Sequence, residues 1–78
     1  MPLYFFDFTD DAERSVPDTM GTELASKDAI PEEAVAVLAI HAKDRLSDGS
    51  HRVFAASVRD QEGRVLFKAT LTLQSGWQ

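Results

Sequence analysis

Cysteine is absent from the 78-residue sequence. Small secreted domains are commonly cross-linked by disulfides, so this absence favours a reducing, cytoplasmic environment. The beginning, Met1 to Tyr4, lacks the basic and apolar regions of an export signal. No stretch approaches the ~20 apolar residues that a membrane-spanning helix needs. We therefore expect a cytoplasmic protein without a membrane partner.

Basic residues are also few: 8 Lys and Arg stand against 13 Asp and Glu, for a net charge of −5. They are scattered along the chain and form no basic run. A negative surface repels phosphate backbones. A nucleic-acid partner is therefore not expected.

Side chains that could carry chemistry are sparse. His41 and His51 have no metal-site spacing, and without cysteine a metal would need them together with carboxylates. Asp7, Asp10 and Asp11 cluster near the first predicted turn, but they lack the pattern of a calcium loop, and we expect solvated turn residues. No serine lies in a nucleophile context. We expect no cofactor and no enzymatic activity.

The apolar fraction of 44%, with five phenylalanines, indicates a folded protein rather than a disordered one. Its length supports one domain over residues 1–78, with one thin core.

The first half of the chain predicts a hairpin and a loop. Residues 3–9 alternate as a strand, with Tyr4, Phe6 and Phe8 on one face. Residues 14–16 can return as a short edge strand that Pro17 ends. Residues 18–26 are expected to connect this hairpin to a helix, with Gly21 at positive φ.

A helix is predicted from about Lys27 to Leu46. Ser26 or Asp28 is suited to cap it, and Pro31 falls in the first turn, where a missing N–H costs least and where the geometry can be irregular. Helical spacing predicts one apolar stripe, made of Ala34, Val35, Leu38 and Ala42.

Two further strands are predicted over residues 51–60 and 64–74. The segment Asp60–Gly63 between them has the composition of a tight turn, with Gly63 in the left-handed region. In the last strand Val65, Phe67, Ala69, Leu71 and Leu73 share a face, and Leu66, Lys68, Thr70 and Thr72 share the other.

The predicted fold class is α+β with the order ββαββ: two β-hairpins form a four-stranded sheet, and one long helix packs on one face. The strand order stays open. We expect Phe6, Leu38 and Phe67 to meet in the core, because they share the phase of the apolar stripes.

Three segments carry a resemblance: Tyr4-Phe5-Phe6-Asp7, the loop Pro17-Asp18 followed by Gly21-Thr22-Glu23-Leu24, and Val58-Arg59-Asp60-Gln61-Glu62-Gly63-Arg64-Val65. In this order and spacing they resemble a bacterial family of small domains of unknown function, numbered 6894. Pro31 departs from the helix former expected there. The resemblance implies a compact ββαββ domain and brings no activity.

One helix covers one sheet face, and the other face carries apolar residues. The candidate interface residues there are Leu3, Phe5, Val53 and Leu66, interrupted by Asp7 and Lys68. A contiguous apolar surface usually marks an interface. A helix flank with Val37 and Ile40 is a competing patch, and pairing of edge strands is a variant. A monomer with scattered apolar residues is the alternative.

These patterns favour a non-enzymatic interaction or structural module that forms a homo-oligomer, most simply a homodimer. The alternative is a small-ligand-binding or regulatory domain that uses the region from Asp7 to Gly21 beside the sheet.

Overall fold

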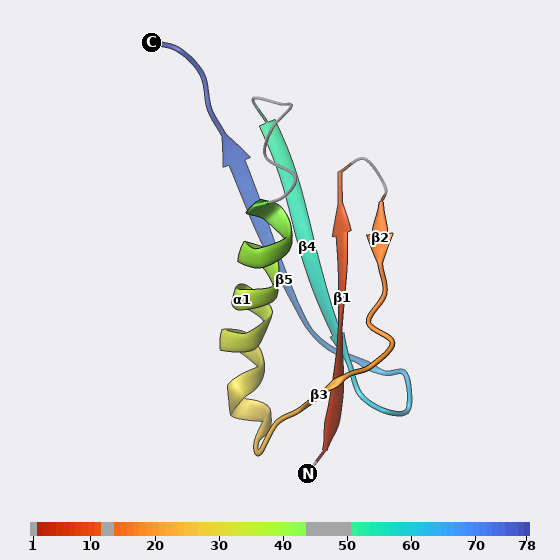
Figure 1. Cartoon of the computed structure of the whole chain (residues 1–78). Helices are drawn as coiled ribbons and strands as arrows, with labels where there is room; N and C mark the ends of the chain where they lie inside the picture. The colour runs from red at the N-terminus through yellow and green to blue at the C-terminus, as the bar shows by residue number, and fades with distance from the viewer. Residues whose placement is uncertain (1, 12–13, 44–50) are drawn as a thin grey trace.

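The computed structural model describes residues 2–11, 14–43 and 51–78. One helix lies across one face of an antiparallel sheet, in two layers (Figure 1). The predicted α+β class is confirmed. We call the sheet face opposite the helix the open face.

The sheet contains both predicted hairpins. Its strands are β1 (Leu3–Asp10), β2 (Ser15–Val16), β3 (Thr22–Glu23), β4 (His51–Arg59) and β5 (Val65–Gln74). The order is β2-β1-β4-β5, and all neighbours are antiparallel. The two hairpins are therefore joined through β1 and β4.

Strand β3 lies in a segment that was predicted to be a loop. It pairs with the start of β1, with Leu3 opposite Glu23, while β2 pairs with the end of β1. Two short strands thus share one edge of β1, and the loop between them spans the gap. A two-residue strand carries no periodicity that sequence analysis can detect.

The helical segment begins with a 3-10 turn, Lys27–Ala29, and continues as α1, Ile30–Lys43. Ser26 caps it: its hydroxyl accepts the N–H of Asp28 at 3.1 Å. The expected irregular first turn next to Pro31 is therefore present. The predicted helix end at Leu46 lies outside the described residues.

The buried stripe of α1 differs from the prediction at its edge. Its buried residues are Ile30, Ala34, Leu38 and Ala42. Val35 is 60% exposed, so its place in the stripe was wrong, whereas Val37, which was expected on the exposed flank, packs against the core. Residues at i, i+4 and i+8 lie on a narrow line along the helix surface. The sheet lies toward the Val37 side of this line, so Val37 is covered and Val35 is not. Ile40 is exposed, as expected.

The core has two clusters along the helix. Ala34 packs with Phe6, and Phe67 lies against this cluster, whereas Leu38 packs in the second cluster with Phe8 and Phe54. The predicted meeting of Phe6 with Phe67 is correct, but the inclusion of Leu38 was wrong. Leu38 lies four residues beyond Ala34, about 6 Å further along the helix axis.

A register shift moves the start of β5. The pairing shifts by one residue between Val58, which lies opposite Phe67, and Arg59, which lies opposite Val65. Val65 therefore no longer shares a face with Phe67. Arg59 extends over the open face, where its guanidinium lies 4.6 Å from the ring centre of Phe5. Val65 therefore belongs to the open face, and its predicted place on the helix face was wrong. A bulge of one residue reverses the alternation of side chains.

Gly21 and Gly63 both have positive φ, +77° and +86°, as expected. They differ in their surroundings: a Cβ at Gly21 would lie 2.8 Å from Cγ of Leu3, and a Cβ at Gly63 would meet nothing within 4 Å.

We predict that Gly63→Ala lowers the free energy of unfolding by about 1–2 kcal/mol, the cost of the left-handed backbone. Gly21→Ala is expected to lower the free energy of unfolding by about 1–3 kcal/mol more than this, because its new Cβ would overpack against Leu3. Urea titrations of both variants measure this difference, and equal losses would contradict the role of Leu3.

Candidate functional site

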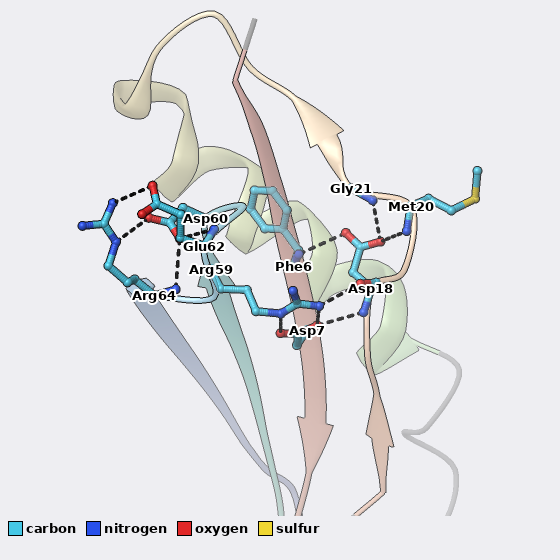
Figure 2. Close-up of polar contacts among 9 residues, drawn as sticks. All are labelled: Phe6, Asp7, Asp18, Met20, Gly21, Arg59, Asp60, Glu62 and Arg64. Carbon is cyan, nitrogen blue, oxygen red and sulfur yellow. Dashed lines mark hydrogen bonds and ion pairs between the residues drawn. The ribbon is translucent and has the colours of Figure 1, made fainter.

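Asp18 organises the edge of β1 between β2 and β3 (Figure 2). One carboxylate oxygen accepts the backbone N–H of Phe6 at 3.0 Å, and the other accepts those of Met20 and Gly21 at 3.1 and 3.0 Å. The Phe6 N–H points into the gap between the two short strands. A buried backbone donor needs an acceptor, and the Asp18 side chain supplies it in place of a strand.

Asp7 and Arg59 attach this loop to β4. Asp7 Oδ1 accepts the N–H of Asp18 at 2.8 Å, and Asp7 Oδ2 lies 2.8 Å from Nε of Arg59. Arg59 also donates to the carbonyl of Asp18 at 3.0 Å (Figure 2). Asp7 was expected to interrupt the open face as a charge. Its charge is instead paired with Arg59, whose guanidinium covers one side of Phe5.

The same contacts set the protonation of these groups. Burial of the Asp18 carboxyl acts to raise its pKa, but the N–H donors of Gly21, Phe6 and Met20, with Arg59 nearby, outweigh burial and hold the pKa below 3.8. The hydrogen bond to Asp7 raises the pKa of Arg59. Both groups are therefore charged at neutral pH, with their oxygens and nitrogens committed to the fold.

Asp10 is not the solvated turn residue that the sequence predicted, whereas Asp11 does lie exposed in the turn, although its carboxylate has partners. Asp10 is buried, accepts the N–H of Arg14 at 3.1 Å, and lies 3.6 Å from a guanidinium nitrogen of Arg52. Asp11 accepts the N–H of Val53 at 3.0 Å and the Nε–H of Arg52 at 3.1 Å. The Val53 hydrogen bond is the main cause that lowers the pKa of Asp11. These carboxylates attach the first hairpin to β4.

The histidines do not come together. His41 is half-buried, its ring stacks on Phe8 with centres 4.8 Å apart, and Nδ1 lies 3.0 Å from the carbonyl oxygen of Val37. His51 is exposed at the start of β4. Among the described residues, no group of three or more His, Cys, Asp or Glu side chains is arranged to hold a metal ion.

The region from Asp7 to Gly21, considered for a small ligand, contains a hollow of about 290 Å³ between the loop and α1. Its lining residues are Phe6, Val16, Pro17, Asp18, Thr19, Thr22, Val37 and His41. Asp18 is the acidic member, and its carboxylate already accepts three backbone N–H groups. The carboxylate that lines this hollow is therefore engaged mainly in hydrogen bonds that hold the fold.

The turn between β4 and β5 is fixed by Asp60. Its carboxylate accepts the N–H groups of Glu62 and Arg64 at 2.9 and 3.0 Å and the Nε–H of Arg64 at 2.9 Å (Figure 2). These bonds lower the pKa of Asp60, with the Arg64 N–H as the main cause. Gly63 donates its N–H to the carbonyl of Asp60 at 3.1 Å, as in the predicted turn.

The four candidate interface residues do not form one patch. Leu3, Phe5 and Leu66 lie toward the end of the sheet that holds the β4–β5 turn, where Val65 joins them. Val53 lies on the same face of β4 as Arg59 but six residues away, about 20 Å along the strand. Leu3, Phe5 and Val53 are half-buried, and Leu66 is 39% exposed. The open face alone thus offers less exposed apolar surface than the sequence indicated.

The two edges of the sheet are built differently. The β1 edge is covered by two strands of two residues each and by the Asp18 loop. The β5 edge is ten residues long, and within the described parts of the chain no strand pairs with its outer side (Figure 1). Long free edges can pair with another chain, and proteins usually blunt them. Among the described residues, the β1 edge is blunted and the β5 edge is not.

The hydrogen-bond register identifies the outward groups of β5. Phe6 points its N–H away from β4, so Val58, opposite Phe6, points toward β5, and Phe67, opposite Val58, points back to β4. Backbone direction alternates along a strand. The outward N–H and C=O groups of β5 are therefore those of Lys68, Thr70, Thr72 and Gln74.

Exposed apolar side chains lie beside this edge. Leu71 faces the helix side of the sheet, opposite Phe54, and is 40% exposed. Val35 projects from the flank of α1 opposite Val37, which lines the hollow beside β2. Val65 is 65% exposed at the start of β5. The free edge and these side chains form the candidate interaction surface, which we call the β5 surface: β5 with Val35 of α1.

A family model described as a domain of unknown function, DUF6894, matches residues 3–72. The chain belongs to this family. No curated protein and no solved structure matches it. The structure of this DUF6894 domain joins the three segments that carried the resemblance: Asp7, Asp18 and Arg59 each come from a different one, and they form one network.

One feature of the sequence does indicate part of this network. Asp18 follows Pro17 and precedes Gly21, a composition typical of a turn in which an aspartate binds backbone N–H groups two and three residues on. Nothing in the sequence indicates that the other carboxylate oxygen reaches Phe6, which is twelve positions away. Among the described helices of the DUF6894 domain, none is long and apolar enough to cross a membrane.

Proposed function

We propose that this DUF6894 domain is a non-enzymatic interaction module of the cytoplasm that forms a homodimer by pairing β5 with β5 of a second copy. The observation that supports this proposal is the contrast between the two sheet edges: one is closed by the Asp18 loop, and the other has no partner over ten residues among the described parts of the chain. Pairing two such edges satisfies their outward backbone groups and continues the sheet through both copies.

Two-fold symmetry restricts the register. An antiparallel β5 pair uses all outward positions when Lys68 faces Gln74, and Thr70 faces Thr72, of the second copy. Leu71 then lies on the symmetry axis and faces Leu71 of the second copy. Such a pair is not hydrogen-bonded, so its side chains approach closely, with Cα atoms about 4.5 Å apart. The register covers the exposed part of Leu71 with an identical side chain.

The helices fit the same arrangement. Helix α1 lies mainly over β4 and β5, and neighbouring strands are about 4.8 Å apart. Its axis is therefore about 5 Å from the symmetry axis, and the two helices are about 10 Å apart, the upper end of normal helix packing. Val35 projects into the space between them. The arrangement thus supplies a second layer of contact above the paired strands.

Charge also favours this edge. Each copy carries a net charge of −5, which opposes association. Strand β5 contains no acidic residue, and Lys68 is its one charged side chain. In the proposed register Lys68 faces Gln74, so like charges are not placed opposite each other. Copies that approach along β5 therefore meet through a strand without acidic side chains.

We expect the double variant Thr70→Glu/Thr72→Glu to be a folded monomer, because each new carboxylate faces another across the axis. Both threonines are exposed and point their backbone groups outward, so the fold should survive. Light scattering should give about 8.6 kDa for the variant and twice this mass for the unmodified protein.

The matched control is the opposite double variant, Thr70→Lys/Thr72→Lys. It should also be monomeric alone, and an equal mixture of the two variants should restore a dimer, because each glutamate then faces a lysine. A dimer of the glutamate variant alone, or an unmodified protein that stays monomeric at high concentration, would contradict the proposed function.

A further inference from the structure

Trp77 is the most exposed large apolar side chain in the described structure. It is the single tryptophan of the sequence, and its relative exposure is 103%. It belongs to residues 75–78, which continue beyond β5 and away from the rest of the sheet (Figure 1). Tryptophan has the largest apolar surface of any side chain and is enriched where partners bind most tightly.

A hollow of about 420 Å³ lies at the opposite end of the sheet, beside the β4–β5 turn. Its apolar lining includes Leu3, Val65 and Leu66, and its polar lining consists of Lys27, Asp60, Gln61, Glu62 and Arg64. The side chain of Arg64 is 68% exposed, although it contacts Asp60 and Glu62. Apolar side chains with a guanidinium beside them are suited to an aromatic ring, since a cation can lie over its face.

Within one copy, Trp77 cannot reach this hollow. Strand β5 separates them, and ten extended residues span about 34 Å. In an antiparallel pair the end of one β5 lies beside the start of the other. The register that pairs Lys68 with Gln74 continues to pair Leu66 with Gly76, and Val65 with Trp77, of the second copy.

We infer that in the proposed dimer Trp77 of each copy docks in the hollow beside Val65 and Leu66 of the other copy. This inference rests on the proposed function and names the segment that completes its interface. A stable interface usually buries about 800 Å² per partner. A strand edge and one helix flank are narrow, and two docked tryptophans extend the contact at both ends. Arg64 of the second copy then lies near the indole face.

The fluorescence of Trp77 tests the inference without a label, because no other tryptophan contributes. We expect its emission to shift to shorter wavelength over the concentration range in which light scattering detects the dimer. The monomeric Thr70→Glu/Thr72→Glu variant should show no shift at any concentration. Trp77→Ala should raise the dissociation constant of the dimer at least about tenfold, and Trp77→Phe should raise it less.

Val65→Ser tests the other side of the contact. It should also weaken the dimer, and combining it with Trp77→Ala should add little, because both changes remove one interaction. Both side chains are exposed in the single copy, so thermal unfolding of the dilute monomer should not change.

A dimer whose Trp77 emission stays unshifted would overturn this inference while the β5 pairing stands. A shift that already occurs in the dilute monomer would overturn it as well, because Trp77 would then be covered by its own chain. A monomer at every concentration would overturn the proposed function and this inference together.

Discussion

Phe54→Ala is expected to lower the free energy of unfolding by about 3–5 kcal/mol, a large part of the stability of so small a domain. Phe54 is 0% exposed at the centre of β4, and its ring lies 5.9 Å from that of Phe8. It packs under Leu38 of α1 in the second core cluster. Its removal leaves a cavity between the sheet and the helix that neither layer can fill. Urea titration followed by circular dichroism measures the loss.

Phe67→Ala is the matched control. The substitution Phe67→Ala removes the same side-chain atoms as Phe54→Ala. Phe67, however, is half-buried and lies at the margin of the first cluster. We expect a loss clearly smaller than that of Phe54→Ala, because less buried surface is removed and solvent reaches the site. Equal losses would contradict the different burial of the two rings. A greater loss for Phe67→Ala would mean that β5 supports the core more than β4 does.

The regular strands could be predicted because their alternation is long. In β1 and β4 the aromatic and aliphatic residues that face the helix recur at every second position, and the buried residues follow that pattern. The prediction failed at Val65, where one extra residue in β5 opposite Arg59 reverses the faces. A bulge depends on how two strands meet, and the sequence of either strand alone does not contain it.

The polar side chains were the least predictable part. Asp7, Asp10 and Asp11 were interpreted as solvated because acidic residues near a turn usually are. Asp11 does lie exposed in the turn, but all three carboxylates pair with Arg59 or Arg52, which are more than forty positions away in the sequence. Local patterns describe turns and periodicity, whereas these ion pairs depend on β1 lying next to β4. The strand order was open at the level of sequence, and the ion pairs could not be found without it.

The predicted interface shows the same dependence. Leu3, Phe5, Val53 and Leu66 share a face because strand periodicity places them there. Whether they touch depends on register and on neighbours: Arg59 covers Phe5, and Val53 lies at the far end. Pairing of edge strands could be assigned to β5 only once the strand order was known, because β5 is the outermost strand of that order. We therefore propose the β5 surface, rather than the open face, as the interface.

Asp18→Ala is expected to lower the free energy of unfolding by about 3 kcal/mol, because it removes the acceptor of three backbone N–H groups at once. The Phe6 N–H is the important one. It points into the gap between β2 and β3, where no strand of the described residues could take the place of the carboxylate. Asp18→Asn keeps one side-chain oxygen and should lose less. Urea titration at pH 7 measures both, in dilute solution so that association does not contribute.

The pH dependence separates this role from general loss of packing. The pKa of Asp18 is below 3.8 in the folded protein, whereas in the unfolded chain it is near its ordinary value. The charged carboxylate therefore contributes its full stabilisation above about pH 4, and the contribution is lost as the pH falls through the lower, folded pKa.

The unmodified protein should lose stability steeply below about pH 4. Asp11 and Asp60, whose pKa values are also lowered, retain part of that slope in any Asp18 variant. Asp18→Asn should show a shallower slope below about pH 4, with the difference from the unmodified protein greatest at neutral pH. Parallel curves for the two proteins would mean that the charge of Asp18 does not stabilise the β1 edge.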